Sequence, residues 1–155
     1  MSEMLGNQYF LGRKYLEAAK ELEEVLTDQP HNKTAMKKLV ICYSQLGNVQ
    51  KTLTIFHDLI SEDIGIIINT DIVEDDCPCP ELVNKSDDPE NESNKSFDYY
   101  AMHGVLWLYC NVQKSLNYFE KASEMDSSNK LLKSILSLIN SYIDKNGIPK
   151  PFLPN

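Results

Sequence analysis

The chain has no long apolar run and no cluster of basic residues. No stretch approaches the roughly 20 apolar residues that a membrane-spanning helix needs, and no basic segment followed by an apolar one opens the sequence. We therefore expect a cytoplasmic protein. The formal net charge of -8 disfavours binding to a phosphate backbone, so we expect neither a nucleic-acid partner nor a membrane partner.

The usual signatures of catalysis are also missing. The sequence contains no glycine-rich phosphate loop, no His-Glu-x-x-His and no Gly-x-Ser-x-Gly. His31, His57 and His103 are scattered along the chain, so they do not complete a four-ligand zinc site with Cys77 and Cys79. We expect no metal, no cofactor and no enzymatic activity.

The four cysteines fall into two kinds. Cys42 and Cys110 lie within apolar helical patterns, whereas Cys77 and Cys79 are separated by one proline in an acidic segment. A disulfide between these two would close a very tight loop against the preferred geometry, so we expect free thiols. The neighbouring acids disfavour a thiolate and so argue against a redox sensor.

What the sequence does contain is an internal repeat. One constant shift along the sequence superposes Leu5 on Leu39 and Tyr9 on Tyr43. A second shift is longer than the first by the length of segment 67–95, which indicates a third repeat placed after an insertion. The second shift superposes Leu39 on Met102, Tyr43 on Leu106, Thr52 on Ser115, Phe56 on Phe119 and Leu59 on Ala122.

The repeat resembles a known family. Leu5-Gly6-x-x-Tyr9, then Ala18-x-x-x-Leu22 and Pro30, is similar to the tetratricopeptide repeat pattern of large and small residues. The second repeat lacks the closing proline, and in the third repeat Gly104 is displaced by one place. The resemblance implies an all-α fold, a right-handed α-solenoid of antiparallel helix pairs. The implied organisation is 1–66 for two repeats, 67–95 for an acidic insertion, 96–129 for the third repeat, 130–146 for a capping helix and 147–155 for a tail.

Helical periodicity independently supports paired helices. Apolar residues three and four apart predict helices over about 3–11 and 15–27, separated by a turn at Gly12. Pro30 ends the second helix and Asn32 can cap the next one. Seven helices are expected in all, two in each repeat and one at the end.

The insertion carries most of the charge imbalance. Residues 67–95 hold nine acidic and two basic side chains, and Pro78, Pro80 and Pro89 are expected to exclude regular helix. We expect residues 84–95 to be poorly ordered, and residues 66–73 to extend the preceding helix or pack against the repeats. The insertion either contacts a partner, or competes with one for the groove, or is simply tolerated in solvent.

The resemblance also places a binding groove. In this family the first helix of each pair lines the concave face, where aromatic anchors would carry binding energy and Lys37 and Lys38 would take an acidic or C-terminal group. Trp107 and Leu108 could instead pack beneath the insertion or the last helix. The groove residues expected from helical phase are Asn7, Phe10, Leu11, Lys37, Lys38, Ile41, Ser44, Gln45, Tyr100, Trp107 and Leu108.

The family's two-carboxylate clamp for chaperone tails is not expected. Asn7 stands at its asparagine place, but Glu3, Lys38, Phe97 and Ala101 stand where other residues are needed. The resemblance thus implies a non-catalytic scaffold or adaptor that binds a protein or peptide segment. A small three-repeat secretion or assembly chaperone and a regulatory subunit of an enzyme complex are the alternatives, and homo-oligomerisation stays open.

Overall fold

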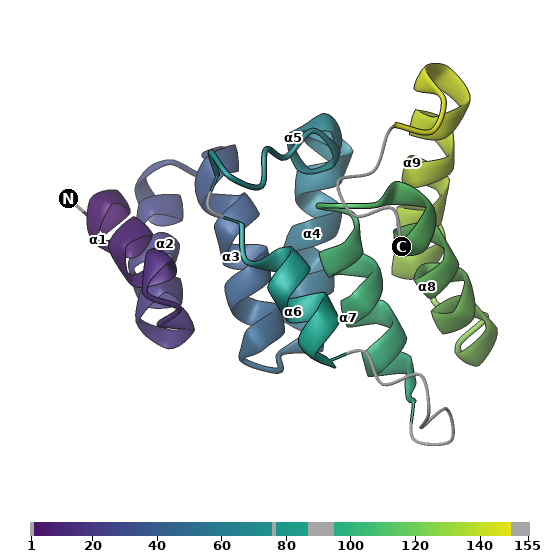
Figure 1. Cartoon of the computed structure of the whole chain (residues 1–155), viewed down its shortest axis with the longest axis horizontal. Helices are drawn as coiled ribbons and strands as arrows, with labels where there is room; N and C mark the ends of the chain where they lie inside the picture. Colours follow the sequence, from purple (N-terminus) through teal and green to yellow (C-terminus); the bar gives the residue numbers. More distant parts are fainter. Residues whose placement is uncertain (1, 76, 87–94, 150–155) are drawn as a thin grey trace. The chain divides into compact units, whose positions relative to one another are not determined.

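A computed structural model of the chain describes residues 2–75, 77–86 and 95–149. Every regular element within these ranges is a helix, and the described residues form no strand (Figure 1). The predicted all-α class is therefore confirmed. The helices are α1 (Ser2–Leu11), α2 (Tyr15–Asp28), α3 (Lys33–Gln45), α4 (Val49–Asp63), α5 (Gly65–Ile68), α6 (Cys79–Ser86), α7 (Phe97–Trp107), α8 (Val112–Met125) and α9 (Lys130–Asn146).

The chain divides into two compact units, Met1–Leu59 and Ile60–Asn155. The division falls inside α4. The right-handed superhelix concerns the arrangement of all the helix pairs and stays a prediction.

The first unit begins with the helix pair that the sequence predicts. Helices α1 and α2 pack together, and α3 packs against α2. A Cβ atom on Gly6 would lie 3.1 Å from the side chain of Leu22, so the glycine permits a close approach of α1 to α2. The predicted bounds of 3–11 and 15–27 agree with α1 and α2 to within a residue at each end.

Asparagine caps recur at matching places in the chain. Asn32 and Asn129 precede α3 and α9, and Asn48 and Asn111 precede α4 and α8. In each case the side-chain oxygen accepts a hydrogen bond of 3.0 to 3.1 Å from the backbone N–H three residues later. Each cap thereby satisfies one of the donors that a helix start leaves unpaired, as the sequence predicts for Asn32.

The second unit is built around α7. Helices α8 and α6 both pack against α7, and α9 packs against α8 (Figure 1). The Ser115 hydroxyl of α8 donates a hydrogen bond of 2.6 Å to the Gly104 carbonyl of α7, and Phe119 packs against the same glycine. Leu132, Ile135 and Ile139 are buried and give α9 one apolar side, as the sequence predicts for the last helix.

The insertion corrects two expectations. Helix α6 forms although prolines were expected to exclude it, because Pro80 stands in the first turn, where no backbone N–H is needed for the helix. Residues 84–86 belong to this helix, while 87–94, the rest of the segment expected to be poorly ordered apart from Lys95, lie outside the described residues. Residues 66–73 do not extend α4, since α5 is a separate short helix. The burial of Ile67 agrees with the other alternative, that this segment packs against its neighbours.

The expectation of free thiols at Cys77 and Cys79 is also wrong. The structure joins the two residues in a disulfide. Their Cα atoms lie 5.5 Å apart, which is within the usual range for a disulfide, because the chain bends where α6 begins. Cys42 and Cys110 are free and buried.

Candidate functional site

Three of the predicted groove residues meet between α1 and α3. The Lys38 ammonium group of α3 donates a hydrogen bond of 2.8 Å to the Asn7 side-chain oxygen of α1. The same Nζ atom lies 5.8 Å from the centroid of the Phe10 ring. We call the surface formed by Glu3, Asn7, Phe10, Lys37 and Lys38 the α1–α3 face.

The other predicted residues of the first unit differ in how far they are accessible. Phe10 and Ile41 are buried, so they support this surface and offer little area to a partner. Leu11 is 57% exposed and Gln45 is exposed. Ser44 is half-buried, and its hydroxyl donates to the Ile41 carbonyl at 2.7 Å within α3.

The charge of α3 contrasts with that of the whole chain. The helix contains Lys33, Lys37 and Lys38 and no acidic residue, while the chain has a formal net charge of -8. Lys37 and Lys38 are half-buried, so they retain accessible surface. This part of the molecule is thus suited to a partner segment that carries negative charge.

Helix α7 does not have the orientation expected from the sequence. Gly104 faces α8, because a Cβ atom there would lie 2.8 Å from the Phe119 ring. Trp107 lies on the same side, with Lys114 Nζ 4.3 Å from its ring centroid. Tyr100 also faces α8, where its ring centroid lies 6.3 Å from that of Tyr118.

A one-residue slip in the repeat explains the difference. Lys51 Nζ lies 5.3 Å above the Tyr43 ring, a contact that matches Lys114 above Trp107. The shift that superposes the second repeat on the third brings Lys51 onto Lys114, but it brings Tyr43 one position short of Trp107. Helix α7 is therefore one residue out of phase with α8, and the displaced Gly104 is the sequence signal of this slip.

The slip moves the expected groove positions of α7 to Ala101, Val105 and Leu108, which we call the outer face of α7. These residues are spaced by four and three, so they share one side of the helix, and all three are buried. Of the predicted residues of the third repeat, Leu108 keeps its place, whereas Tyr100 and Trp107 belong to the contact with α8. The outer face is a different side of α7 from the one that packs on α8.

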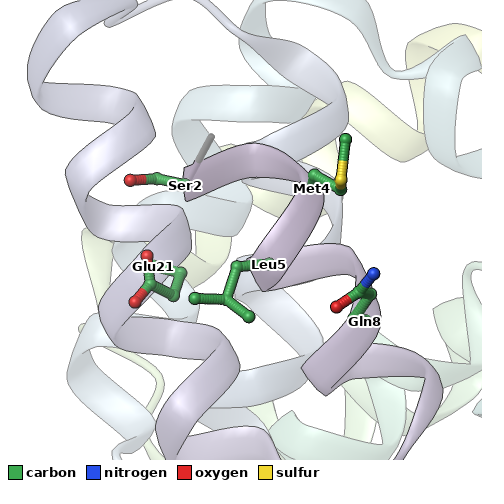
Figure 2. A pocket seen from close by; sticks show the side chains of 5 residues that line it. All are labelled: Ser2, Met4, Leu5, Gln8 and Glu21. Carbon is green, nitrogen blue, oxygen red and sulfur yellow. The ribbon is translucent and has the colours of Figure 1, made fainter.

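A pocket opens between α1 and α2 in the first unit. It has a volume of about 400 Å³ and is lined by Ser2, Met4, Leu5, Gln8 and Glu21 (Figure 2). The side chain of Leu5 points toward Glu21 in this view. The lining contains one carboxylate and no histidine or cysteine, so it does not resemble a catalytic constellation. A second pocket of about 320 Å³ is lined by Tyr43, Gln50, Lys51, Thr54, Ile55 and Asp58.

The described part of the chain shows neither a metal-ligand cluster nor a membrane-spanning helix. Within residues 2–75, 77–86 and 95–149 no three histidine, cysteine or acidic side chains gather in a way that could hold a metal ion. In the same part of the chain no helix is both long enough and apolar enough to cross a bilayer.

The number of cysteines that can be alkylated should depend on whether the chain is folded and whether the disulfide is reduced. Burial raises the pKa of the Cys42 and Cys110 thiols from 9.0 to about 12. Iodoacetamide at pH 8 should therefore modify no cysteine in the native chain, two in urea and all four in urea with a reductant, as counted by intact mass. Modification of four cysteines in urea without reductant would contradict the disulfide.

Because the pKa values of these two thiols are raised, the free energy of unfolding should decrease at alkaline pH. Because the folded state favours their protonated forms, their contribution to the free energy of unfolding is complete below the unfolded pKa of 9.0. This contribution is lost as the pH rises from 9.0 towards about 12.

Comparison of the chain with protein-family models, with curated proteins and with solved structures finds no match in any of the three. The resemblance to tetratricopeptide repeats therefore stays a prediction from the sequence pattern.

Proposed function

We propose that this protein is a non-catalytic adaptor that binds a segment of another protein along the first helices of its helix pairs. The observation that carries the proposal is the packing of α6 against α7. Helix α6 comes from the insertion and not from the repeat, so a first helix of this chain accepts a short amphipathic helix from outside the repeat pattern. Helix-in-groove binding is a common mode of peptide recognition.

The α1–α3 face supports the same function with a different chemistry. Lys38 donates to Asn7 and lies over the buried Phe10 ring, and the half-buried Lys37 adds a second ammonium group, so the surface offers hydrogen-bond donors and positive charge. The ordered contact of Lys38 with Asn7 holds one ammonium group in place before a partner arrives. We propose that this face takes an acidic stretch or a C-terminal carboxylate.

Charge reversal on α3 tests the proposal. The Lys37→Glu, Lys38→Glu variant is expected to weaken a partner identified by copurification at least tenfold, measured by calorimetry, because two attractions become repulsions. Loss of the bond from Lys38 to Asn7 should lower the free energy of unfolding by only about 1 kcal/mol.

The matched control is Lys14→Glu, Lys20→Glu. It makes the same change in net charge at two positions outside the α1–α3 face. The control should weaken binding only through the change in net charge of the whole chain. This long-range effect should decrease as salt is added. Equal losses in both variants, or none in either, would show that α3 does not provide the binding surface.

A further inference from the structure

We propose that α6 is a built-in ligand that covers the outer face of α7 and is displaced when a partner helix of the same pattern binds there. The proposal rests on the proposed function and names one of its sites, the chemistry of its partner and a means of regulating it. It concerns the second unit alone, in which both helices lie.

Helix α6 has the form of a ligand helix. Val83 and Cys79 are four residues apart, which places them on one side of the helix, and each is 0% exposed. Glu81 and Asn84 are exposed on the other side. The helix therefore presents a narrow apolar stripe to a neighbour, and in this unit the helix against which it packs is α7.

The receiving face on α7 is correspondingly apolar. Ala101 and Val105 are 0% exposed and Leu108 is 1% exposed, although the contacts to α8 are made by another side of α7. The small Ala101 permits close approach of a second helix, while Val105 and Leu108 supply aliphatic area. We infer that α6 buries these three side chains.

The equivalent positions in the first unit differ in a way that fits this assignment. They are Glu3, Asn7 and Phe10 on α1, and Lys37, Ile41 and Ser44 on α3. Both sets contain polar side chains that are half-buried, whereas the set on α7 is wholly apolar and buried. These positions are thus partly polar on α1 and α3 but wholly apolar on α7, the helix against which α6 packs.

The length of α6 makes displacement feasible. A helix of eight residues is too short to be stable by itself, so its order depends on its packing and on its attachment to the chain. That attachment gives α6 a high effective concentration, which a free partner must overcome. The expected partner segment is a short amphipathic helix with aliphatic residues four apart on one side and acidic or polar residues on the other.

The test uses the full-length chain and a fluorescent synthetic peptide of residues 77–86. Val83→Asp places a charge in the buried stripe of α6 and should release this helix from α7. The peptide should then bind the Val83→Asp chain at least tenfold more tightly than the wild-type chain, measured by fluorescence anisotropy. Asn84→Asp introduces the same residue on the exposed side of α6, so this control should bind the peptide no better than the wild type does.

Two additions keep the test decisive. Val83→Ala removes two methyl groups without burying a charge, so it gives a smaller gain in the same direction even if Val83→Asp proves unfolded by circular dichroism. A peptide that itself carries Val83→Asp should bind none of the chains. If folded Val83→Ala and Val83→Asp chains take up the wild-type peptide no better than the wild-type chain does, α6 does not cover a docking face.

Failure here would remove the support that α6 gives to the proposed function, which would then rest on the α1–α3 face alone. A partner that still depends on Lys37 and Lys38 would show an adaptor whose α6 is a fixed structural element. If the partner binds equally well without Lys37 and Lys38, and the Val83 variants take up the peptide as expected, the binding surface lies on α7 and not on α3.

Discussion

Replacing Leu39 by alanine is expected to lower the free energy of unfolding by about 2 to 5 kcal/mol, the usual range for a buried leucine. Leu39 is 1% exposed in α3, which packs against α2. Its counterpart one repeat earlier, Leu5, is 38% exposed and lines the open pocket of the first unit. Leu5→Ala should therefore lower stability by about 1 kcal/mol or less.

Urea unfolding followed by circular dichroism measures both variants, and the comparison removes any effect of side-chain type. The sequence alone predicts equal roles for the two leucines, because they stand at one position of the repeat. The structure predicts unequal roles, because one face is covered and the other opens into a pocket. Equal losses of stability would mean that Leu5 is covered as fully as Leu39.

Gly104→Ala is expected to lower the free energy of unfolding by about 1 to 3 kcal/mol, the typical cost of overpacking. The added methyl group would lie 2.8 to 2.9 Å from three atoms of the Phe119 ring, so the ring or the helix must move. Alanine is better than glycine inside a helix by about 1 kcal/mol, and we expect the steric cost to exceed this gain. Thermal and urea unfolding give the measured loss.

Gly6→Ala provides the comparison for the Gly104 prediction. Its methyl group would lie 3.1 Å from the nearest side-chain atoms, which belong to Leu22, and this is a longer contact than the 2.8 Å at Gly104. The gain in helix propensity should largely offset this milder contact, so stability should change little. Phe119→Leu should also reduce the penalty of Gly104→Ala in a double-mutant cycle. No coupling between Gly104 and Phe119 would contradict the orientation of α7.

Much of the first unit could be predicted from the sequence because its signals are local. Gly6, Pro30 and Asn32 mark close packing, a helix end and a helix start, and α1, α2 and α3 follow these marks. The four asparagine caps could have been found in the same way, because each stands immediately before an apolar helical pattern.

The face of α7 was harder to predict because a change of one residue turns a helix by about 100°. The shift that superposes the second repeat on the third aligns α8 correctly and α7 wrongly, and only the displaced Gly104 indicates the difference. Tyr100 and Trp107 were therefore expected at the groove, but they lie on the side of α7 that contacts α8. Ala101 and Val105, which look unremarkable in the sequence, lie on the outer face of α7.

The prediction that prolines exclude regular helix from the insertion was wrong because the composition was averaged over the whole of 67–95. Nine acids and three prolines suggest a solvated loop, but Cys79 and Val83 form a local apolar stripe around a proline that suits a helix start. The disulfide depends on the backbone bend before α6, which residue spacing alone does not reveal.

Methyl NOE spectroscopy of the wild-type chain tests the central claim, that the outer face of α7 holds a short amphipathic helix. The account predicts cross-peaks from the Val83 methyl groups to the methyl groups of Ala101, Val105 or Leu108. Val83 methyl groups with cross-peaks to none of these three residues in the wild-type chain would contradict it.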